Sequence, residues 1–217
     1  MSQTSNPKFL KSEQTKLRIM DVYLDLISEK EWDKISVKEI CANANITRGT
    51  FYLYFNDIYD LLEQIEDPLL QKLIQKYQQT PSKEAFSFSG GSFEEHFDLE
   101  PPMQLVFWFD FCSSHKKEMK ALLGSHGDPY FTTKLKNILS EQILKMMDHD
   151  SMPHDELRSH FTKAFLELHF LVARTWLDSS EDNFLSTKEI IHILNTMRIG
   201  ANYLSHATNS QPSTPDI

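Results

Sequence analysis

The stretch ITRGTFYLYF, residues 46–55, concentrates side chains that can hydrogen-bond to phosphate groups and to base edges. Hydroxyl groups suit phosphate oxygens, and an arginine reaches either a phosphate or the edge of a guanine. The side chains that carry these groups are Thr47, Arg48, Thr50, Tyr52 and Tyr54. Gly49 lies among them and, because it has no side chain, would let a ligand backbone come close. The residue types and their spacing therefore indicate contacts with a nucleic acid.

These side chains need a rigid support, and the local sequence predicts two short helices joined by a tight turn. Ser36 and Glu39 have the spacing of a capping box, in which each side chain bonds the backbone amide of the other residue. Asn45 suits a left-handed turn position, where asparagine is tolerated better than most residues. Thr47 suits the N-cap of a second helix that runs to about Tyr54. This layout is typical of a helix-turn-helix, whose second helix enters the major groove.

The aromatic residues of the second helix divide between two faces. At 100° per residue, Phe51 and Phe55 share one face, which predicts that they pack against the first helix of the motif. The residues expected on or beside the opposite face are Gly49, Thr50, Tyr52 and Leu53, with Arg48 and Tyr54 at its flanks. Two core tyrosines would both need buried partners for their hydroxyls, so we expect Tyr52 and Tyr54 to face the ligand.

The rest of the chain also predicts helices, and we expect an all-α fold. Apolar residues recur every three or four positions, there are only six glycines, and no alternating strand pattern occurs. Helices are expected over residues 12–30, 57–79 with an interruption at Pro68, 102–123, 128–147, 153–177 and 186–206. Asp128 is expected to cap the helix over 128–147, and Ser186 with Glu189 to form a second capping box. The first of these helices is expected to carry Leu17, Met20, Leu24 and Ile27 on one face, and the helix over 128–147 an apolar stripe of Phe131, Leu135, Leu139, Ile143 and Met146. Residues 80–101 contain serine, Gly-Gly and proline, which predict a loop, and their phenylalanines are expected to pin that loop to the core.

Composition and charge exclude several classes of protein. The 217 residues contain no apolar run long enough to span a membrane, and the polar N-terminus lacks a secretion signal, so we expect a cytoplasmic protein. Residues 1–56 carry eight basic and seven acidic side chains, so of the net charge of −9 the remainder carries −10. Repulsion of that acidic remainder would orient the near-neutral N-terminal part toward DNA. Cys41 and Cys112 are expected to be buried, reduced thiols.

Catalytic and metal-binding residues are not indicated. There is no nucleophile–base–orienter set and no glycine loop of the kind that cradles phosphate. His149 and His154 lie among carboxylates, but without a cysteine or a regular helical spacing they do not predict a physiological metal site. We therefore expect neither an enzyme nor a bound cofactor.

The N-terminal quarter to third of the chain resembles the TetR family of bacterial transcription regulators. The resemblance runs from Ile19 to about Leu62, through IMDVYLDLISEKEW, SVKEICANANI, TRGTFYLYF and DIYDLL. It implies a DNA-binding domain over residues 12–62, preceded by a flexible basic arm over 1–11 that carries Lys8 and Lys11. It also implies a C-terminal helical domain over 63–206 that forms a homodimer and binds an effector. Residues 207–217 would be a disordered tail.

The resemblance also implies roles for individual residues. Ser36 and Lys38 would contact phosphate. The groove and its walls would be contacted by Thr47, Arg48, Gly49, Thr50, Tyr52 and Tyr54. The family often has lysines just after this segment, where this chain has Asn56 and Ile58, so weaker and less salt-dependent DNA binding is expected. The family usually has glycine where this chain has Glu31 and Asn45.

Two further sites are expected in the C-terminal part. Two aromatic stripes on facing helices predict an effector pocket for an apolar or aromatic molecule, although the same residues would also suit an ordinary core. The residues expected to line it are Met103, Phe107, Phe111, Phe165, His169 and Trp176. The last two helices are apolar enough to use one face for the core and one for a second copy, with Gly200 and Ala201 allowing close approach.

The function expected from these observations is sequence-specific binding of double-stranded DNA at a palindromic operator, as a repressor that a small effector releases. The effector would shift the spacing of the two DNA-binding units through the helix expected over residues 57–79. One alternative is an activator or co-regulator that binds another protein through residues 80–101. Another is a helical enzyme or carrier in which the N-terminal motif is vestigial.

Overall fold

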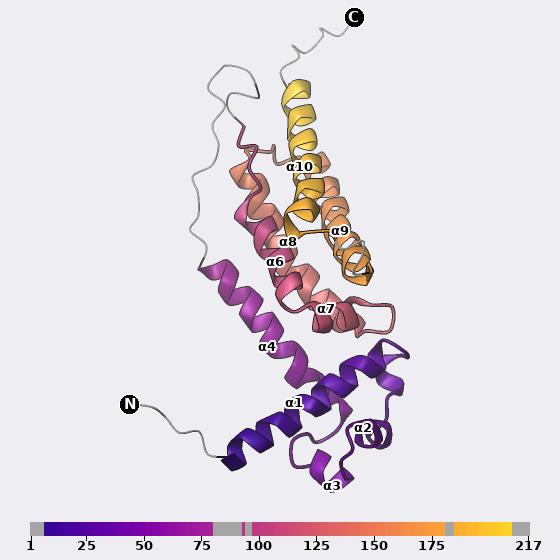
Figure 1. The fold of residues 1–217 in the computed structure, drawn as a ribbon. Helices are drawn as coiled ribbons and strands as arrows, with labels where there is room; N and C mark the ends of the chain where they lie inside the picture. The colour runs from indigo at the N-terminus through magenta and orange to yellow at the C-terminus, as the bar shows by residue number, and fades with distance from the viewer. Residues whose placement is uncertain (1–6, 80–92, 94–96, 181–184, 210–217) are drawn as a thin grey trace, which may run out of the picture. The chain divides into compact units, whose positions relative to one another are not determined.

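The computed structural model describes residues 7–79, 93, 97–180 and 185–209, and within these ranges all regular structure is helical (Figure 1). This confirms the expected all-α class. The helices are α1 (Pro7–Ile27), a 3₁₀ turn (Trp32–Lys34), α2 (Val37–Asn43), α3 (Arg48–Phe51), α4 (Ile58–Gln78), α6 (Met103–Ser114), α7 (Lys116–Leu123), α8 (Pro129–His149), α9 (Glu156–Asp178) and α10 (Thr187–Asn209). They form two compact units, Met1–Lys72 with Lys116–Thr133, and Leu73–His115 with Lys134–Ile217.

Helix starts follow the capping residues that the sequence predicts. The Ser36 side chain accepts a hydrogen bond from the Glu39 amide, and the Glu39 carboxylate accepts one from the Ser36 amide, which together form the capping box of α2. Ser186 and Glu189 repeat the arrangement at α10. The Asp128 carboxylate accepts a bond from the amide of Tyr130 at the start of α8. All three starts were predicted from side chains within four residues of the cap, and all three are confirmed.

Several helix boundaries differ from the expected ones. Helix α1 begins at Pro7, earlier than the expected residue 12. Residues 1–6 of the expected arm, most of the expected loop over 80–101 and residues 210–217 of the expected tail lie outside the described residues. The single helix expected over 102–123 is divided at His115, whose φ of −124° and ψ of 43° leave the helical region. The start of α9 lies after Asp155, because that carboxylate caps the Arg158 amide, and not at Pro153. The recognition helix α3 is also shorter than expected, since it ends at Phe51 and residues 52–54 form a turn.

Helix α4 continues through Pro68, where an interruption was expected. Proline removes one hydrogen bond and crowds the preceding turn, at a cost of roughly 3 kcal/mol. Leu61, Ile65 and Leu69 are buried along one face on both sides of the proline. Each such side chain contributes about 1.5–3 kcal/mol when it is buried, so packing outweighs the local penalty.

The first unit has a core that α1 shares with the helix-turn-helix. Ile19, Tyr23 and Ile27 form the buried stripe of α1, whereas Leu17, which was expected on that face, is 60% exposed. Helix α1 packs against α2 and also against α7, which comes from much later in the chain. The ammonium of Lys117 on α7 lies 2.5 Å from Asp21 and 2.7 Å from Asp25 on α1.

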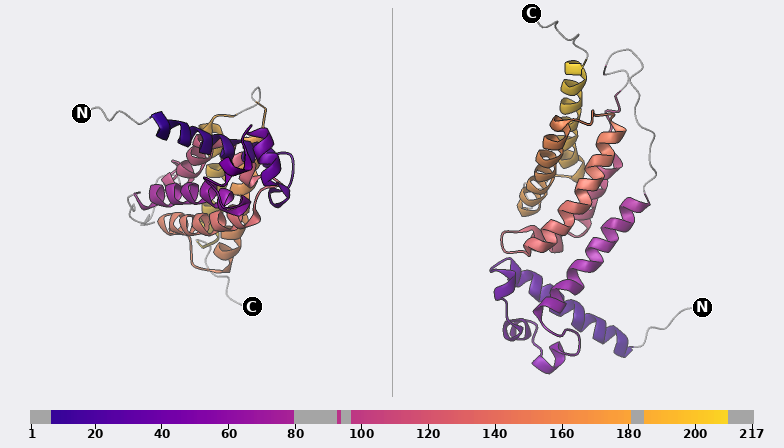
Figure 2. Two further views of the ribbon diagram at one scale, coloured as in Figure 1. Left: turned by 90° about the horizontal axis from the view of Figure 1, so that it is seen from below. Right: turned by 180° about the vertical axis from the view of Figure 1, so that it is seen from behind.

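The second unit is built on contacts of α10 with α6 and α9 and of α6 with α9, and α9 and α10 run side by side in the views of Figure 2. Its interior is aromatic: Trp108 and Phe109 of α6 and Phe165 and Phe170 of α9 are fully buried. The α8 stripe predicted from the sequence is buried as expected; its residues are Phe131, Leu135, Leu139, Ile143 and Met146.

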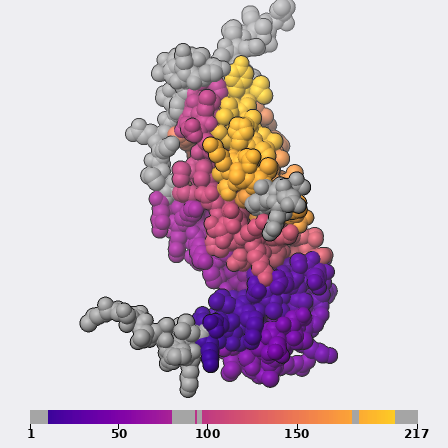
Figure 3. Space-filling model, in the orientation of Figure 1, coloured from indigo at the N-terminus to yellow at the C-terminus, as the bar shows by residue number. Residues whose placement is uncertain are grey.

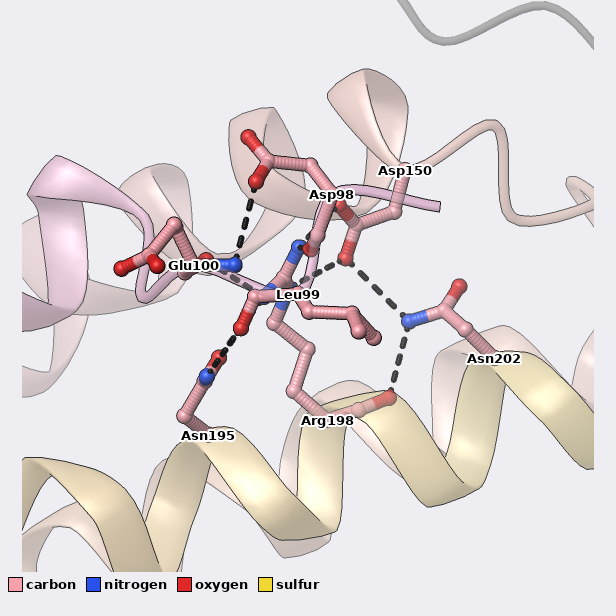
Figure 4. Close-up of polar contacts among 7 residues, drawn as sticks. All are labelled: Asp98, Leu99, Glu100, Asp150, Asn195, Arg198 and Asn202. Carbon is pink, nitrogen blue, oxygen red and sulfur yellow. Dashed lines mark hydrogen bonds and ion pairs between the residues drawn. The ribbon is translucent and has the colours of Figure 1, made fainter. Parts of the chain in front are cut away.

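A buried arginine joins three segments of the second unit (Figure 4). Arg198 of α10 is 1% exposed, and its Nε and Nη2 donate to the two carboxylate oxygens of Asp150 at 2.7 and 3.0 Å. Nη1 donates to the Glu100 carbonyl at 3.1 Å, and Nη2 to the Asp98 carbonyl at 2.8 Å. Nη1 also donates to Asn195 Oδ1 at 2.7 Å, so all five N–H donors of the guanidinium are used.

Two amides on α10 complete this group. Asn195 Nδ2 donates to the Leu99 carbonyl at 2.8 Å, and Asn202 Nδ2 donates to the Asp150 carboxylate at 3.2 Å. The Arg198 guanidinium also lies over the buried Phe97 ring, 4.8 Å from its centroid. The Arg198 cluster, by which we mean Arg198, Asp150, Asn195 and Asn202, therefore attaches residues 97–100 and the chain just after α8 to one face of α10.

Candidate nucleic-acid interface

Backbone geometry fixes the turn between α2 and α3. Asn45 has a φ of 50°, in the left-handed region, as its sequence position predicts. The amide of Asn45 donates to the Ala42 carbonyl, and the amide of Ile46 donates to the Cys41 carbonyl at 3.0 Å. These bonds reverse the chain directly after α2, and they set the direction in which α3 begins.

The start and the inner face of α3 are as predicted. The Thr47 hydroxyl caps the helix by accepting from the Thr50 amide at 3.1 Å, and the two threonine hydroxyls lie 2.9 Å apart. Phe51 and Phe55 are fully buried, with their ring centroids 5.5 Å apart. The two phenylalanines hold α3 to its support, as expected, and the remaining side chains of the segment are available on its other faces.

The predicted groove-facing residues are accessible to different degrees. Thr47, Arg48, Gly49 and Tyr52 are exposed, whereas Thr50 and Tyr54 are half-buried. The Tyr54 hydroxyl accepts a hydrogen bond from Ser12 of α1 at 3.2 Å. This bond ties the flank of the recognition segment to α1. The contacts of these residues with DNA remain predictions.

Leu53 is not among the predicted site residues, although it lies between two of them, Tyr52 and Tyr54, and is exposed. Its side chain is 78% exposed, more than any other large apolar side chain among the described residues. Its position on the helical wheel, opposite Phe51 and Phe55, was the signal in the sequence that could have identified it.

The start of α2 offers one free basic side chain. Lys38 is exposed, whereas the Ser36 hydroxyl is engaged with the Glu39 carboxylate at 2.7 Å. That carboxylate also lies 2.6 Å from the Lys30 ammonium. Hydrogen bonds from Lys30 and then from Ser36 lower the pKa of Glu39 to about 2. The carboxylate is therefore ionised at neutral pH, and the Lys30 ammonium compensates its charge.

Two carboxylates accept hydrogen bonds from backbone amides at the start of α4. Asp57 Oδ1 accepts from the amides of Tyr59 and Asp60, each at 2.9 Å. Asp60 Oδ2 accepts from the Asn56 amide at 2.7 Å and from its side chain at 2.8 Å. Hydrogen bonds from Gln64 and then from Asn56 lower the pKa of Asp60. The amides of Tyr59 and Asp60, at the start of the helix, are thus occupied by the Asp57 carboxylate of the chain itself.

The residues expected to line an effector pocket are only partly brought together. His169 lies against Phe165, with ring centroids 4.6 Å apart, and against Phe109, at 6.3 Å; Phe109 in turn contacts Trp176 at 6.0 Å. Phe109 was not predicted, because its wheel position alone does not say which helix it faces. The other predicted lining residues lie elsewhere: Phe107 faces Tyr77, Phe111 faces His115, and Met103 is exposed.

Two polar groups lie within this aromatic interior. His169 Nδ1 is 2.7 Å from the Phe165 carbonyl, and burial lowers the pKa of the ring to about 4, so the ring is neutral at neutral pH. The Trp108 Nε1 group is buried and has no hydrogen-bond partner among the described residues. A buried N–H without an acceptor is unusual and costs about 1–3 kcal/mol.

The described residues contain no group of three or more His, Cys, Asp or Glu side chains placed to hold a metal. His154 Nε2 lies 3.4 Å from the Asp148 carboxylate, which also pairs with Arg158. None of the helices in the described ranges is both long and apolar enough to cross a membrane.

The geometry of the first unit defines a class of protein: α2, the turn at Asn45 and α3 form a helix-turn-helix supported by α1. Residues 19–65 match the family model described as bacterial regulatory proteins, tetR family. Over these residues the chain is similar to the TetR family of bacterial regulatory proteins. This match confirms the resemblance seen in the sequence.

A curated relative is similar in sequence to part of the chain, and several solved structures share its fold. The chain is 40% identical over 53 residues to the uncharacterized HTH-type transcriptional regulator YvdT of Bacillus subtilis (strain 168), covering 24% of this chain and about a quarter (27%) of that relative. A TetR transcriptional regulator from Streptococcus agalactiae 2603V is similar over 88% of this chain and 96% of its own, with a TM-score of 0.54 and 20% identity.

Other solved structures share the fold at lower identity. A putative TetR-family regulator from Syntrophomonas wolfei str. Goettingen has a TM-score of 0.56 at 14% identity, over 93% of this chain and 99% of its own. The fatty acid degradation regulator FadR from Bacillus halodurans has a TM-score of 0.53 at 14% identity, over 91% and 97%. The C-terminal part of the chain thus has the fold of TetR regulators as well.

Proposed function

We propose that this protein is a cytoplasmic, sequence-specific DNA-binding transcription regulator that acts as a homodimer on a palindromic operator. The observation that carries the proposal is Gly49, which is exposed on α3. A Cβ built at Gly49 would meet only the Thr47 hydroxyl, at 3.7 Å, and its φ lies outside the left-handed region. Nothing within the described chain therefore requires glycine at this position.

Glycine in a helix is less favourable than alanine by roughly 0.5–1 kcal/mol. A helical glycine with open space around it therefore costs stability without an internal benefit. Close approach of DNA to the backbone of α3 accounts for it, because a methyl group there would stand between the helix and the groove. Arg48, Thr47 and Tyr52 are exposed on the same short segment and supply groups suited to phosphates and bases.

The test compares stability with DNA affinity for Gly49→Ala. We expect the free energy of unfolding, measured by urea denaturation, to be unchanged or higher, while affinity for genomic fragments in a gel shift falls at least tenfold. Asn137→Ala, an exposed change on α8 that also favours helix, is the control and should leave affinity unchanged. If the wild-type protein binds no fragment more tightly than random DNA at moderate salt, the proposal is wrong.

Exposed apolar residues on the last two helices support the homodimer. On α10, Ile193, Met197 and Leu204 are exposed at helical spacing, with exposed Gly200 among them, and Figure 3 shows α10, in orange to yellow, at the surface. On α9, Leu157 and Leu171 are exposed. A two-fold bundle of α9 and α10 from each copy would cover these stripes and would place two recognition helices at a fixed separation.

We further propose that the protein is a repressor and that a small apolar or aromatic molecule releases it from DNA. The aromatic interior around His169 and the unpartnered Trp108 Nε1 group support this role, because such a molecule would need few polar contacts. The effector must bind the DNA-incompetent state more tightly. A candidate molecule that does not lower the affinity of the protein for its operator, when added to saturation in the gel shift, is not the effector.

A further inference from the structure

The most exposed large apolar side chain of the described residues lies inside the proposed DNA-reading segment. Leu53 follows α3 by two residues and is 78% exposed. A single exposed leucine on a protein surface needs no explanation. Leu53 differs because polar and aromatic side chains suited to DNA surround it, and because its place on the segment is fixed by buried neighbours.

Backbone hydrogen bonds fix the turn that contains Leu53, directly after α3. The Leu53 amide donates to the Thr50 carbonyl at 3.3 Å, and the amide of Phe55 donates to the carbonyl of Phe51 at 3.1 Å. Phe51 and Phe55 are buried and thereby define the inner face. Leu53 lies between them in the chain and is 78% exposed, so its side chain points away from the core that these rings enter.

Gly49 precedes Leu53 by four residues, and both are exposed on this segment. The centre of the outward face therefore consists of a residue without a side chain and a residue with an apolar one. Neither can hydrogen-bond a base through its side chain. The hydrogen-bonding groups of Arg48, Thr50 and Tyr52 lie to the sides of this centre, where phosphates would be.

Among the base edges of the major groove, the feature that an apolar side chain recognises is the C5-methyl group of thymine. We propose that Leu53 determines sequence specificity by contacting the methyl group of one thymine in each half-site, with Gly49 leaving room for that contact. This inference rests on the proposed function and adds to it the base, thymine, that Leu53 recognises. Loss of one methyl contact corresponds to about a fourfold loss of affinity per half-site.

The experiment uses the full chain and DNA selected from a random duplex library. Each thymine of the selected site is replaced in turn by uracil, which removes only the methyl group, and the dissociation constant is measured by fluorescence anisotropy at fixed salt. With wild-type protein, we expect that replacing one particular thymine in each half-site lowers the affinity of the protein for the DNA about fourfold. With Leu53→Ala, the same replacement should change affinity by less than about 1.5-fold.

Leu17→Ala is the matched control, because Leu17 is also an exposed leucine of the first unit; it should retain the full thymine effect. The salt dependence of binding should be the same for Leu53→Ala and wild type, since no phosphate contact is lost. The inference is overturned if no replacement of thymine by uracil changes the affinity of the wild-type protein, or if the effect of the replacement persists in Leu53→Ala. Either result leaves the proposed function intact. Failure to select any sequence overturns both.

Discussion

The Arg198 cluster makes a strong prediction about stability. Arg198→Met keeps most of the volume of the side chain and removes its charge and its donors. Asp150, which is 3% exposed, would then keep only the bond from Asn202 among the side-chain partners shown in Figure 4. Breaking a buried pair from one side costs about 3–5 kcal/mol, because the remaining charge is left in a poorly solvating interior.

That loss is large compared with the total stability of a folded protein, which is roughly 5–15 kcal/mol. The carbonyls of Asp98 and Glu100 would lose their donors in the same variant, which adds to the effect. We expect the midpoint of urea denaturation, followed by circular dichroism at one fixed protein concentration, to fall strongly. The slope of the transition should stay unchanged if the folded and unfolded states remain the same.

A second variant separates the buried charge from the lost contacts. In Arg198→Met combined with Asp150→Asn, no unpaired charge remains, so the double variant should be more stable than Arg198→Met alone. Arg174→Met, on the exposed side of α9, should change stability by no more than about 0.5 kcal/mol. A loss below about 1 kcal/mol for Arg198→Met, or strict additivity in the double variant, would contradict this prediction.

Three further predictions concern DNA binding, assembly and pH. Asn56→Lys should add a phosphate contact in each half-site and steepen the slope of log K against log salt by about 0.9 per contact; an unchanged slope in anisotropy titrations would contradict it. Met197→Asp should shift sedimentation from dimer to monomer, whereas Leu144→Asp, at a similarly exposed leucine of α8, should stay dimeric. The pKa of His169 falls from 6.5 to about 4 on burial, so its neutral form stabilises the fold above pH 6.5, and up to about 3 kcal/mol is lost as the pH falls toward 4. Urea denaturation at pH 7 and pH 4.5 should show this loss for the wild type and less of it for His169→Gln.

Features set by neighbouring residues could be predicted from the sequence. The capping boxes at Ser36 and Ser186 and the left-handed Asn45 depend on side chains within four positions, and all three agree with the structure. The inward face of α3 was also predictable, because Phe51 and Phe55 are the only pair of rings there at helical spacing that has no polar group.

Features set by distant residues could not be predicted. Arg198 pairs with a carboxylate 48 positions away and with carbonyls about 100 positions away, and no local pattern indicates such contacts. Helix α4 continues through Pro68 because of burial on both sides, which propensity alone does not reveal. The aromatic stripes predicted that rings would be buried. Which helix each ring faces depends on tertiary packing, so the contacts of Phe109 with His169 and Trp176 could not be predicted.

The first unit is discontinuous in sequence, since Lys116–Thr133 belongs to it together with the N-terminal helices. A fragment that ends after α4 would expose the surface of α1 that packs on α7, and it would leave the Trp32 amide without the His126 carbonyl that accepts from it at 3.0 Å. Transferring the first unit to another regulator therefore requires three chain junctions, near residues 72, 115 and 133, rather than one. An exchange of modules during evolution would meet the same constraint, so the DNA-reading part and α7 should be inherited together.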